Sequence, residues 1–291
     1  MCDEKDLARW ARSGLNRRQF GALTGVAALG ACAPMAGGAG GGTAMPLTER
    51  RVSFATPAGT MDGFFVAPSS GRSPAVLFWP DIASLREAKR NMARRLAGRG
   101  YAVLVVNPYY RDVSGEQFSD FADFAGNDGF QKVSPWREKL TAQAIMSDAK
   151  AAVGWLDSQA EVDTARPVGT QGYCMGGPFT FWSAAAVPSR IEAVASFHGG
   201  GLVREGDPMS PHNTFDDTQA RYLVAIARDD DAKAPEHKRI LREAAAEAGR
   251  QAKIEVFAGD HGWTVPDSPS YNEQAAERAF ADLMQMYGAV L

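Results

Sequence analysis

Residues 172–177 read Gly-Tyr-Cys-Met-Gly-Gly, and this stretch decides the fold that we expect for the chain. The run 168–171 before it predicts a strand, and residues 178–187 after it predict a helix. The cysteine therefore lies on a sharp strand-to-helix turn, where the residues two positions away must be glycine to avoid a collision. Such a turn lifts Cys174 above the sheet and points backbone N–H groups and a helix N-terminus at its sulfur, which favours a thiolate.

The Gly-x-Cys-x-Gly spacing resembles the nucleophile turn of α/β-hydrolases, with sulfur in place of the serine oxygen. A free cysteine is as often a small buried hydrophobe, so Cys174 alone leaves both interpretations open. Partners further along the chain distinguish them.

Composition limits the possible classes of function. The chain has 291 residues, 45% of them hydrophobic and 22% charged, which suits one large α/β domain. Its net charge of −3 gives no reason to expect nucleic acid or an anionic membrane surface as a partner. The cysteines are Cys2, Cys32 and Cys174, without a Cys-x-x-Cys pair or a zinc-like Cys/His spacing, so we expect no metal site.

Residues 1–45 are predicted to be a leader and a Gly-rich linker outside the fold. Arg17-Arg18 precedes an apolar run of about 11 residues, which is too short to span a bilayer but fits a signal h-region. This resembles a Tat export signal, so we expect an exported, periplasmic protein. Leu29-Gly30-Ala31-Cys32 also resembles a lipobox, which would make a lipid anchor at Cys32 the expected membrane contact. An ordinary cleavage site at 31–33, or a disordered tail, is the alternative.

The domain is expected over residues 46–291, where strands alternate with helices. This alternation predicts a mostly parallel central sheet with helices on both faces, the α/β-hydrolase fold. The first two strands should form a hairpin, and helix 85–98 should carry a basic face. Strands are expected at 51–55, 61–67, 75–79, 101–106, 168–171, 191–197, 222–227 and 252–257, and helices at 85–98, 140–158, 178–187, 235–248 and 272–287.

Residues 112–136 are rich in Asp, Gly and Phe and show no clean periodicity. A long irregular stretch inside a compact domain is usually a lid or a binding loop. Its aromatic side chains could instead pack on the core.

Three predicted loops carry Cys174, then Asp230 or Asp231, then His261. Each loop leaves the carboxyl end of a strand, and those ends converge on one crevice in an open α/β sheet. A thiol becomes a strong nucleophile when a base removes its proton, and that base needs an orienting carboxylate. We prefer Asp230 as the carboxylate because it lies three residues past the strand end at Ala227, and Asp231 is the alternative.

His261 follows the last predicted strand in a Gly-flanked turn, unlike the other histidines. His198 ends the strand beside the nucleophile strand and is expected to be structural. His237 is expected in a solvated helix and His212 in a polar loop. For the oxyanion, the fold offers the N–H of Met175 and the N–H of Ile82.

Gly-Tyr-Cys-Met-Gly-Gly, Asp81-Ile82, Asn-Pro-Tyr-Tyr-Arg at 107–111 and Gly-Asp-His-Gly-Trp at 259–263 together resemble the dienelactone hydrolase family over residues 50–290. The resemblance implies a hydrolase of lactones or small esters that uses Cys174, Asp230 and His261. It also implies that Asp81 contacts the resting thiol and that Arg111 binds a substrate carboxylate. Trp263 would join them in the substrate site.

Two positions depart from the family pattern. Val265 stands where the family's founding enzymes have a second arginine, and Asp81 replaces a glutamate.

The expected reaction passes through an acyl-enzyme on Cys174 and needs no cofactor. The expected partner is a small-molecule substrate, and the expected state is a monomer or a small homo-oligomer. The alternatives are a non-catalytic binding protein of the same fold and a redox role for Cys174, which lacks a resolving cysteine in the domain.

Overall fold

The structure is a computed structural model that describes residues 45–291. The predicted leader, with its twin arginine and Cys32, lies outside the described residues. Among the residues that are described, no helix is both long and apolar enough to cross a membrane.

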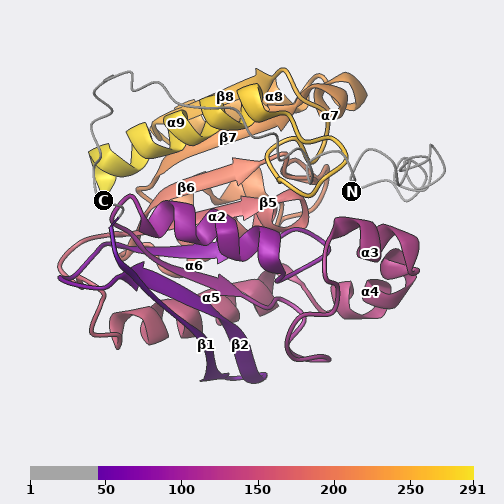
Figure 1. Cartoon of the computed structure of the whole chain (residues 1–291). Coiled ribbons are helices and arrows are strands. Elements are labelled where there is room, and N and C mark those ends of the chain that lie inside the picture. Colours follow the sequence, from indigo (N-terminus) through magenta and orange to yellow (C-terminus); the bar gives the residue numbers. More distant parts are fainter. Residues whose placement is uncertain (1–44) are drawn as a thin grey trace, which may run out of the picture.

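In this part of the chain the strands form one eight-stranded sheet in the order β1-β2-β4-β3-β5-β6-β7-β8 (Figure 1). The β1–β2 hairpin and the β2–β4 pair are antiparallel, and every other pair is parallel, as predicted. The central strands are apolar because both of their faces are buried. The strands are β1 (Leu47–Thr56), β2 (Gly59–Pro68), β3 (Ala75–Trp79), β4 (Ala102–Val106), β5 (Val168–Tyr173), β6 (Ile191–Phe197), β7 (Arg221–Ala227) and β8 (Ala252–Phe257).

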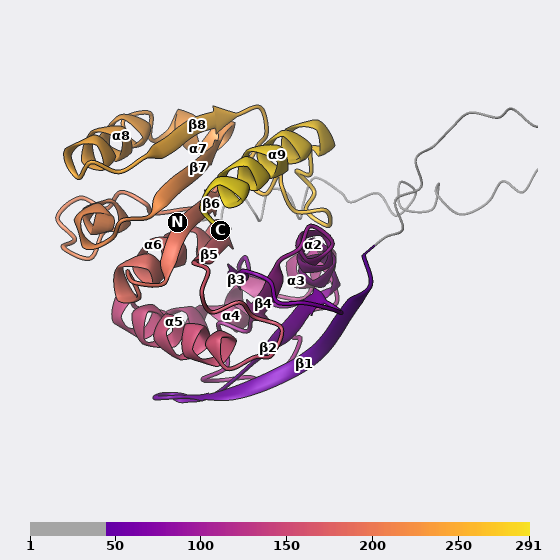
Figure 2. The same cartoon turned by 90° about the vertical axis from the view of Figure 1, so that its left-hand side faces the viewer.

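Helices cover both faces of the sheet (Figure 2). Helices α2 (Glu87–Ala97) and α9 (Glu273–Val290) pack on one face, in a core cluster with Leu96, Leu283 and Tyr287. Helices α5 (Ala142–Asp157), α6 (Gly177–Ala186) and α8 (His237–Glu247) pack on the other. These elements confirm the predicted α/β layers, with helix ends shifted by a few residues.

Residues 112–136 are more ordered than the sequence predicts. They contain α3 (Phe121–Gly126) and α4 (Gly129–Arg137), which lie beside the carboxyl ends of the strands (Figure 1). Asp120 caps α3 because its side chain accepts a hydrogen bond from the N–H of Asp123 at 2.7 Å. The aromatic side chains pack together in a small core with Ile82 and Tyr109. The alternative of packed aromatics is therefore confirmed.

A second correction concerns residues 228–231, which we expected to be a loop. They begin the short helix α7 (Arg228–Lys233) directly after β7. A 3₁₀ helix, η3 (Pro211–Asp217), precedes β7. The carboxyl ends of β3, β5, β7 and β8 thus lead into the four segments that carry the predicted site.

Candidate active site

Cys174 lies on the expected turn between β5 and α6, at the start of the 3₁₀ helix η2 (Cys174–Gly176). Its φ of 52° is in the left-handed region, and its side chain is buried. A Cβ atom on Gly172 would lie 2.0 Å from the carbonyl oxygen of Gly176. A Cβ on Gly176 would lie 2.6 Å from the carbonyl oxygens of Trp79 and Pro80. Both glycines are therefore required by close backbone approach, as the sequence predicts.

His261 and Asp230 contact each other. The Nδ1 atom of His261 lies 2.6 Å from an Asp230 carboxylate oxygen. Asp231 instead pairs with Lys238 at 2.7 Å, and Asp229 accepts a hydrogen bond from the His261 backbone N–H at 2.7 Å. Because α7 turns three consecutive carboxylates in different directions, each has its own partner and only Asp230 reaches the imidazole.

The charge of the imidazole depends on Cys174. Burial lowers the pKa of His261, but the negative charge of Cys174 and hydrogen bonds with Asp230 and Cys174 outweigh burial and raise this pKa to about 10. The sulfur and the carboxylate thus both act on the imidazole of His261. This coupling favours the protonated imidazole.

His198 packs against the His261 ring, with centroids 5.0 Å apart. It is fully buried, and its Nε2 lies 2.8 Å from the Thr264 hydroxyl. Burial, followed by the positive charges of His261 and Lys89, holds the pKa of His198 well below its usual value. His198 is therefore a neutral packing partner, which agrees with the structural role expected for it.

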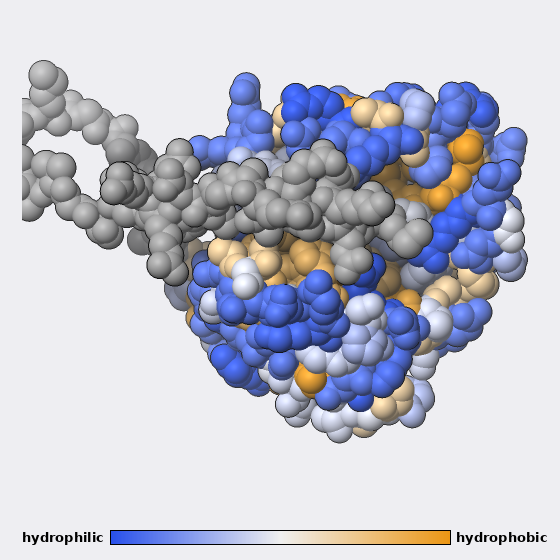
Figure 3. All heavy atoms as spheres, turned by 90° about the vertical axis from the view of Figure 1, so that its right-hand side faces the viewer, coloured by the Kyte–Doolittle hydropathy of each residue, from blue (hydrophilic) through white to orange (hydrophobic). Residues whose placement is uncertain are grey.

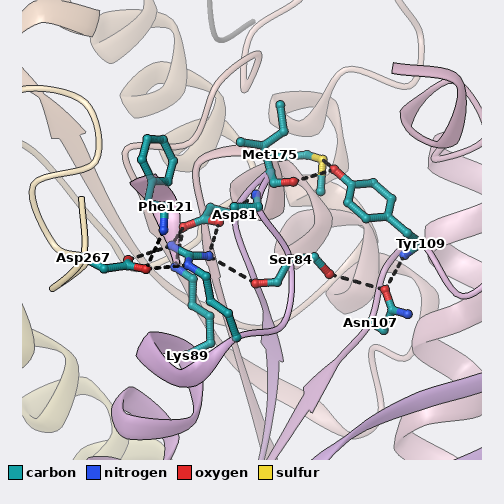
Figure 4. A network of polar contacts seen from close by, with 11 residues as sticks. Asp81, Ser84, Lys89, Asn107, Tyr109, Phe121, Met175 and Asp267 are labelled. Carbon is teal, nitrogen blue, oxygen red and sulfur yellow. Dashed lines mark hydrogen bonds and ion pairs between the residues drawn. The ribbon is translucent and has the colours of Figure 1, made fainter. Parts of the chain in front are cut away.

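Tyr109 joins the segments that carry Ile82 and Met175. Figure 4 shows its ring beside Met175. The Tyr109 hydroxyl donates to the Ile82 carbonyl at 2.9 Å and lies 3.3 Å from the Met175 sulfur. The Ile82 amide donates to no backbone acceptor within residues 45–291. The Met175 amide belongs to the first turn of η2, where helix geometry supplies no acceptor. Both amides predicted for the oxyanion are thus available to a ligand.

Asp81 belongs to a buried ion cluster behind these amides (Figure 4). Its carboxylate receives two hydrogen bonds from Arg86, at 2.7 and 3.0 Å, and lies 2.6 Å from Lys89 Nζ. Arg86 also binds Asp267 at 2.7 and 2.8 Å. The side chains of Arg86 and Lys89 are fully buried. Two residues of the basic face predicted for helix 85–98, Arg86 and Lys89, therefore point inward, because the buried Asp81 requires cations.

The cluster keeps Asp81 ionised. Burial disfavours its charged form, but the charges of Arg86 and Lys89 outweigh burial and hold the pKa of Asp81 well below its usual range. A carboxylate stabilised in this way accepts a proton poorly, so the structure does not support Asp81 as acceptor of the cysteine proton. Its contact with the resting thiol stays a prediction.

Arg111 and Trp263 both have partners within the protein. Arg111 makes two hydrogen bonds of 2.8 Å to Asp148, whose side chain is fully buried. Its contact with a substrate carboxylate stays a prediction. Trp263 is 0% exposed and stacks on Phe257 at 4.9 Å. We therefore reassign Trp263 from substrate binding to the core.

A cleft of about 620 Å³ contains Ile82 and Met175 in its wall. A neighbouring hollow of about 140 Å³ is lined by Asp230 and His261, and both include His237. Figure 3 shows the face toward which the parallel strands point, where hydrophobic surface lies between hydrophilic residues. His237 begins α8, as expected for a residue in a helix, and is half-buried at this junction.

Arg137 and Arg204 also line the cleft, and neither was singled out from the sequence. Arg137 ends α4, one residue beyond the stretch 112–136 that was predicted as a lid or binding loop.

The model of the dienelactone hydrolase family matches residues 61–291. The chain belongs to the dienelactone hydrolase family. A protein of Methylorubrum extorquens named "Putative carboxymethylenebutenolidase" is 27% identical over 238 residues, covering 79% of this chain and 78% of that protein.

Solved structures of this family agree in fold. The crystal structure of the dienelactone hydrolase-like promiscuous phosphotriesterase P91, from metagenomic libraries, has a TM-score of 0.66 at 22% identity and covers 84% of this chain and 98% of its own. The dienelactone hydrolase of Anabaena variabilis has a TM-score of 0.58 at 19% identity. The match covers 84% of this chain and 99% of that protein's chain. At these identities the structures support the shared fold only.

Proposed function

We propose that this member of the dienelactone hydrolase family hydrolyses lactones or small carboxylic esters with Cys174 as nucleophile, His261 as proton carrier and Asp230 as its orienting carboxylate. The observation that carries the proposal is the 2.6 Å contact between His261 and Asp230, on an imidazole whose pKa Cys174 raises. The nucleophile turn and the two available amides complete what acyl transfer needs.

The proposed reaction begins with attack of the Cys174 thiolate on the carbonyl carbon. The amides of Ile82 and Met175 stabilise the negative oxygen that forms. When the carbonyl re-forms, the C–O bond to the leaving alkoxide breaks, and the imidazolium of His261 gives this alkoxide its proton. The neutral imidazole then takes a proton from water, which attacks the thioester. Release of the acid restores the thiolate and the imidazolium.

The test compares Cys174→Ala and two neighbouring carboxamide variants on a small aryl ester. Cys174→Ala should abolish turnover. Asp230→Asn should lower kcat by about a hundredfold or more, because the imidazole loses its orienting partner. Asp231→Asn is the matched control and should leave kcat within about twofold, since Asp231 pairs with Lys238. Turnover retained by Cys174→Ala would refute the nucleophile.

The alternative of a non-catalytic binding protein makes a different prediction. A lactone would then bind without being consumed, and an electrophile would not label Cys174. Mass spectrometry of the protein after exposure to a slowly deacylating ester distinguishes the two. A covalent acyl group on Cys174 supports the hydrolase.

We also propose export to the periplasm, supported by Arg17-Arg18 ahead of a short apolar run. Replacing both arginines with lysine should retain the protein in the cytoplasmic fraction. Equal periplasmic amounts of both forms would refute this route.

A further inference from the structure

A second pocket lies on the face of the sheet that carries α2 and α9. Helix α2 packs over β2 and β4 and α9 over β6 and β7, so β5 lies between the two helices (Figure 1). Their side chains leave a pocket of about 220 Å³ there. Within residues 45–291, none of the residues that line it lines the cleft with Ile82 and Met175 or the hollow with Asp230 and His261. The pocket is therefore separate from the candidate active site.

The wall of this pocket is mostly apolar. Met92 from α2, Phe197 from β6 and Phe280 from α9 are among the side chains that form it. No aspartate or glutamate of residues 45–291 lines the pocket, and Arg95 at its rim pairs with Glu277 at 2.5 Å. An ion would lose its hydration in such a pocket without gaining a free counter-charge. The composition therefore favours an uncharged ligand.

Hydrogen-bond donors lie at the floor of the pocket. Gln171 and Tyr173 of β5 line it and are 0% and 4% exposed. The Gln171 amide nitrogen donates to the Tyr173 hydroxyl at 2.8 Å, and the Gln171 carbonyl oxygen accepts from Tyr287 at 3.2 Å. The Tyr173 hydroxyl hydrogen and the second amide hydrogen of Gln171 then meet no acceptor among residues 45–291. Because buried donors without an acceptor are unfavourable, they suit an oxygen on a ligand.

The size of the pocket limits the ligand. An apolar cavity of about 150 Å³ holds one benzene molecule, so a pocket of about 220 Å³ holds one ring with a short substituent. Rings of Tyr173, Phe197 and Phe280 in the wall can make stacked or edge-to-face contacts with an aromatic ligand. Tyr271, which also lines the pocket, is 39% exposed, so the pocket opens to solvent there.

We propose that the pocket between α2 and α9 is a second ligand site, which binds a small uncharged aromatic compound with one acceptor oxygen. The ring packs against the apolar wall, and the oxygen accepts a hydrogen bond from Tyr173 or Gln171. The site is linked to the candidate active site, because Thr264 lines the pocket and its hydroxyl lies 2.8 Å from Nε2 of His198, whose ring packs on that of His261. Binding there requires no hydrolysis, so the inference does not depend on the proposed function.

The experiment titrates acetophenone, an aromatic ketone without an ester bond, into full-length protein that carries ¹³C-labelled methionine methyl groups. Met92 lines the pocket and Met175 lines the cleft, so their NMR signals distinguish the two places. Met92→Leu and Met175→Leu assign these signals. The Met92 signal should shift along a saturating curve with a Kd on the order of 1 mM or lower, a normal affinity for a ligand of this size. The Met175 signal should stay in place over the same range.

Substitutions on α9 test the position of the ligand. Ala279 is buried and lines the pocket, so Ala279→Leu should fill it and weaken acetophenone binding by about tenfold or more. Ala276→Leu enters the same pocket from the preceding turn and replaces this variant if Ala279→Leu does not fold. Ala281→Leu is the matched control, because Ala281 is exposed on the same helix. It should leave the Kd within about twofold.

The acceptor oxygen is tested with α-methylstyrene, which has the shape of acetophenone with a CH₂ group in place of the oxygen. It should bind about threefold to tenfold more weakly, because it leaves the donors of Gln171 and Tyr173 unpaired. Equal or tighter binding of α-methylstyrene would overturn the assigned ligand class. The site itself is overturned if Met92 shows no saturating shift, if Met175 shifts along the same curve, or if Ala281→Leu weakens binding as much as Ala279→Leu. None of these results bears on the hydrolase, which the Cys174→Ala assay tests separately.

Discussion

The buried cluster behind the candidate oxyanion segment makes a quantitative prediction for Arg86→Met. Arg86 binds two carboxylates, Asp81 and Asp267, and its side chain is 0% exposed. Methionine has a similar length and is apolar, so the substitution removes the charge and leaves little empty space. Lys89 is then the one remaining cation in contact with the buried Asp81 among the described residues, and the partly buried Asp267 loses its partner Arg86. In the unfolded chain water solvates both carboxylates, so the loss of Arg86 costs no free energy of desolvation there.

The expected magnitude follows from burial. Removing one partner of a buried ion pair costs about 3–5 kcal/mol, because the remaining charge stays desolvated. Arg94 provides the matched comparison, since it also pairs with two carboxylates, Glu49 and Glu87, but its side chain is 30% exposed. Exposed pairs contribute about 0–1 kcal/mol. Arg86→Met should therefore cost about 3 kcal/mol more than Arg94→Met.

Urea denaturation of the two variants and the wild type measures this difference. With an m-value of about 3 kcal/mol/M, the extra cost moves the unfolding midpoint down by about 1 M. Equal midpoints for Arg86→Met and Arg94→Met would refute the reasoning, because the two substitutions differ mainly in burial. A small cost for Arg86→Met would mean that water reaches the cluster and solvates Asp81.

Three further outcomes are expected. Gly172→Ala should abolish soluble, active protein, since its Cβ would lie 2.0 Å from the Gly176 carbonyl oxygen; normal expression and esterase activity would contradict the close approach. In an NMR pH titration the imidazole of His261 should stay protonated through pH 8, and Cys174→Ser should lower its pKa because a neutral hydroxyl replaces the sulfur's charge. Since this pKa is raised from 6.5 to about 10, the proton stabilises the folded protein fully below pH 6.5, and the contribution is lost as pH rises toward 10. Tyr109→Phe should lower kcat by about tenfold with little change in KM, because the candidate oxyanion segment loses the hydroxyl that holds it; an unchanged kcat would make Tyr109 a packing residue only.

Much of this architecture follows from local sequence signals. Apolar runs separated by amphipathic segments predict the parallel sheet, and Gly-x-Cys-x-Gly predicts the turn at Cys174. The sequence leaves Asp230 and Asp231 as alternatives, and the structure separates them because Asp230 lies 2.6 Å from His261 while Asp231 pairs with Lys238. Asp120 before α3 and Thr141 before α5 are N-cap residues. An aspartate is a favoured N-cap, so Asp120 is a sequence signal for the first of the two short helices.

The polar partners could not be predicted, because they are distant in sequence. Arg86 meets Asp267 across 181 positions, and Arg111 meets Asp148 across 37. On a helix, Arg86 and Lys89 have the spacing of a solvated face, and only the fold brings carboxylates to them. Trp263 shares a motif with His261, yet its ring points into the core beside Phe257. A motif shows which residues are neighbours in sequence, but not which of them face a ligand.

Backbone strain identifies the functional edge independently of any motif. Within residues 45–291 the non-glycine residues with positive φ are Ser84, Asp128, Cys174 and His198. Such conformations cost on the order of 1–3 kcal/mol each and persist only where the surroundings fix them. Cys174 and His198 follow neighbouring parallel strands, Ser84 lies in the segment that holds Ile82, and Asp128 precedes the helix that carries Arg137. The strain at non-glycine residues thus gathers in segments beside the carboxyl ends of the parallel strands, which is the distribution expected if these segments are held for chemistry at the sulfur.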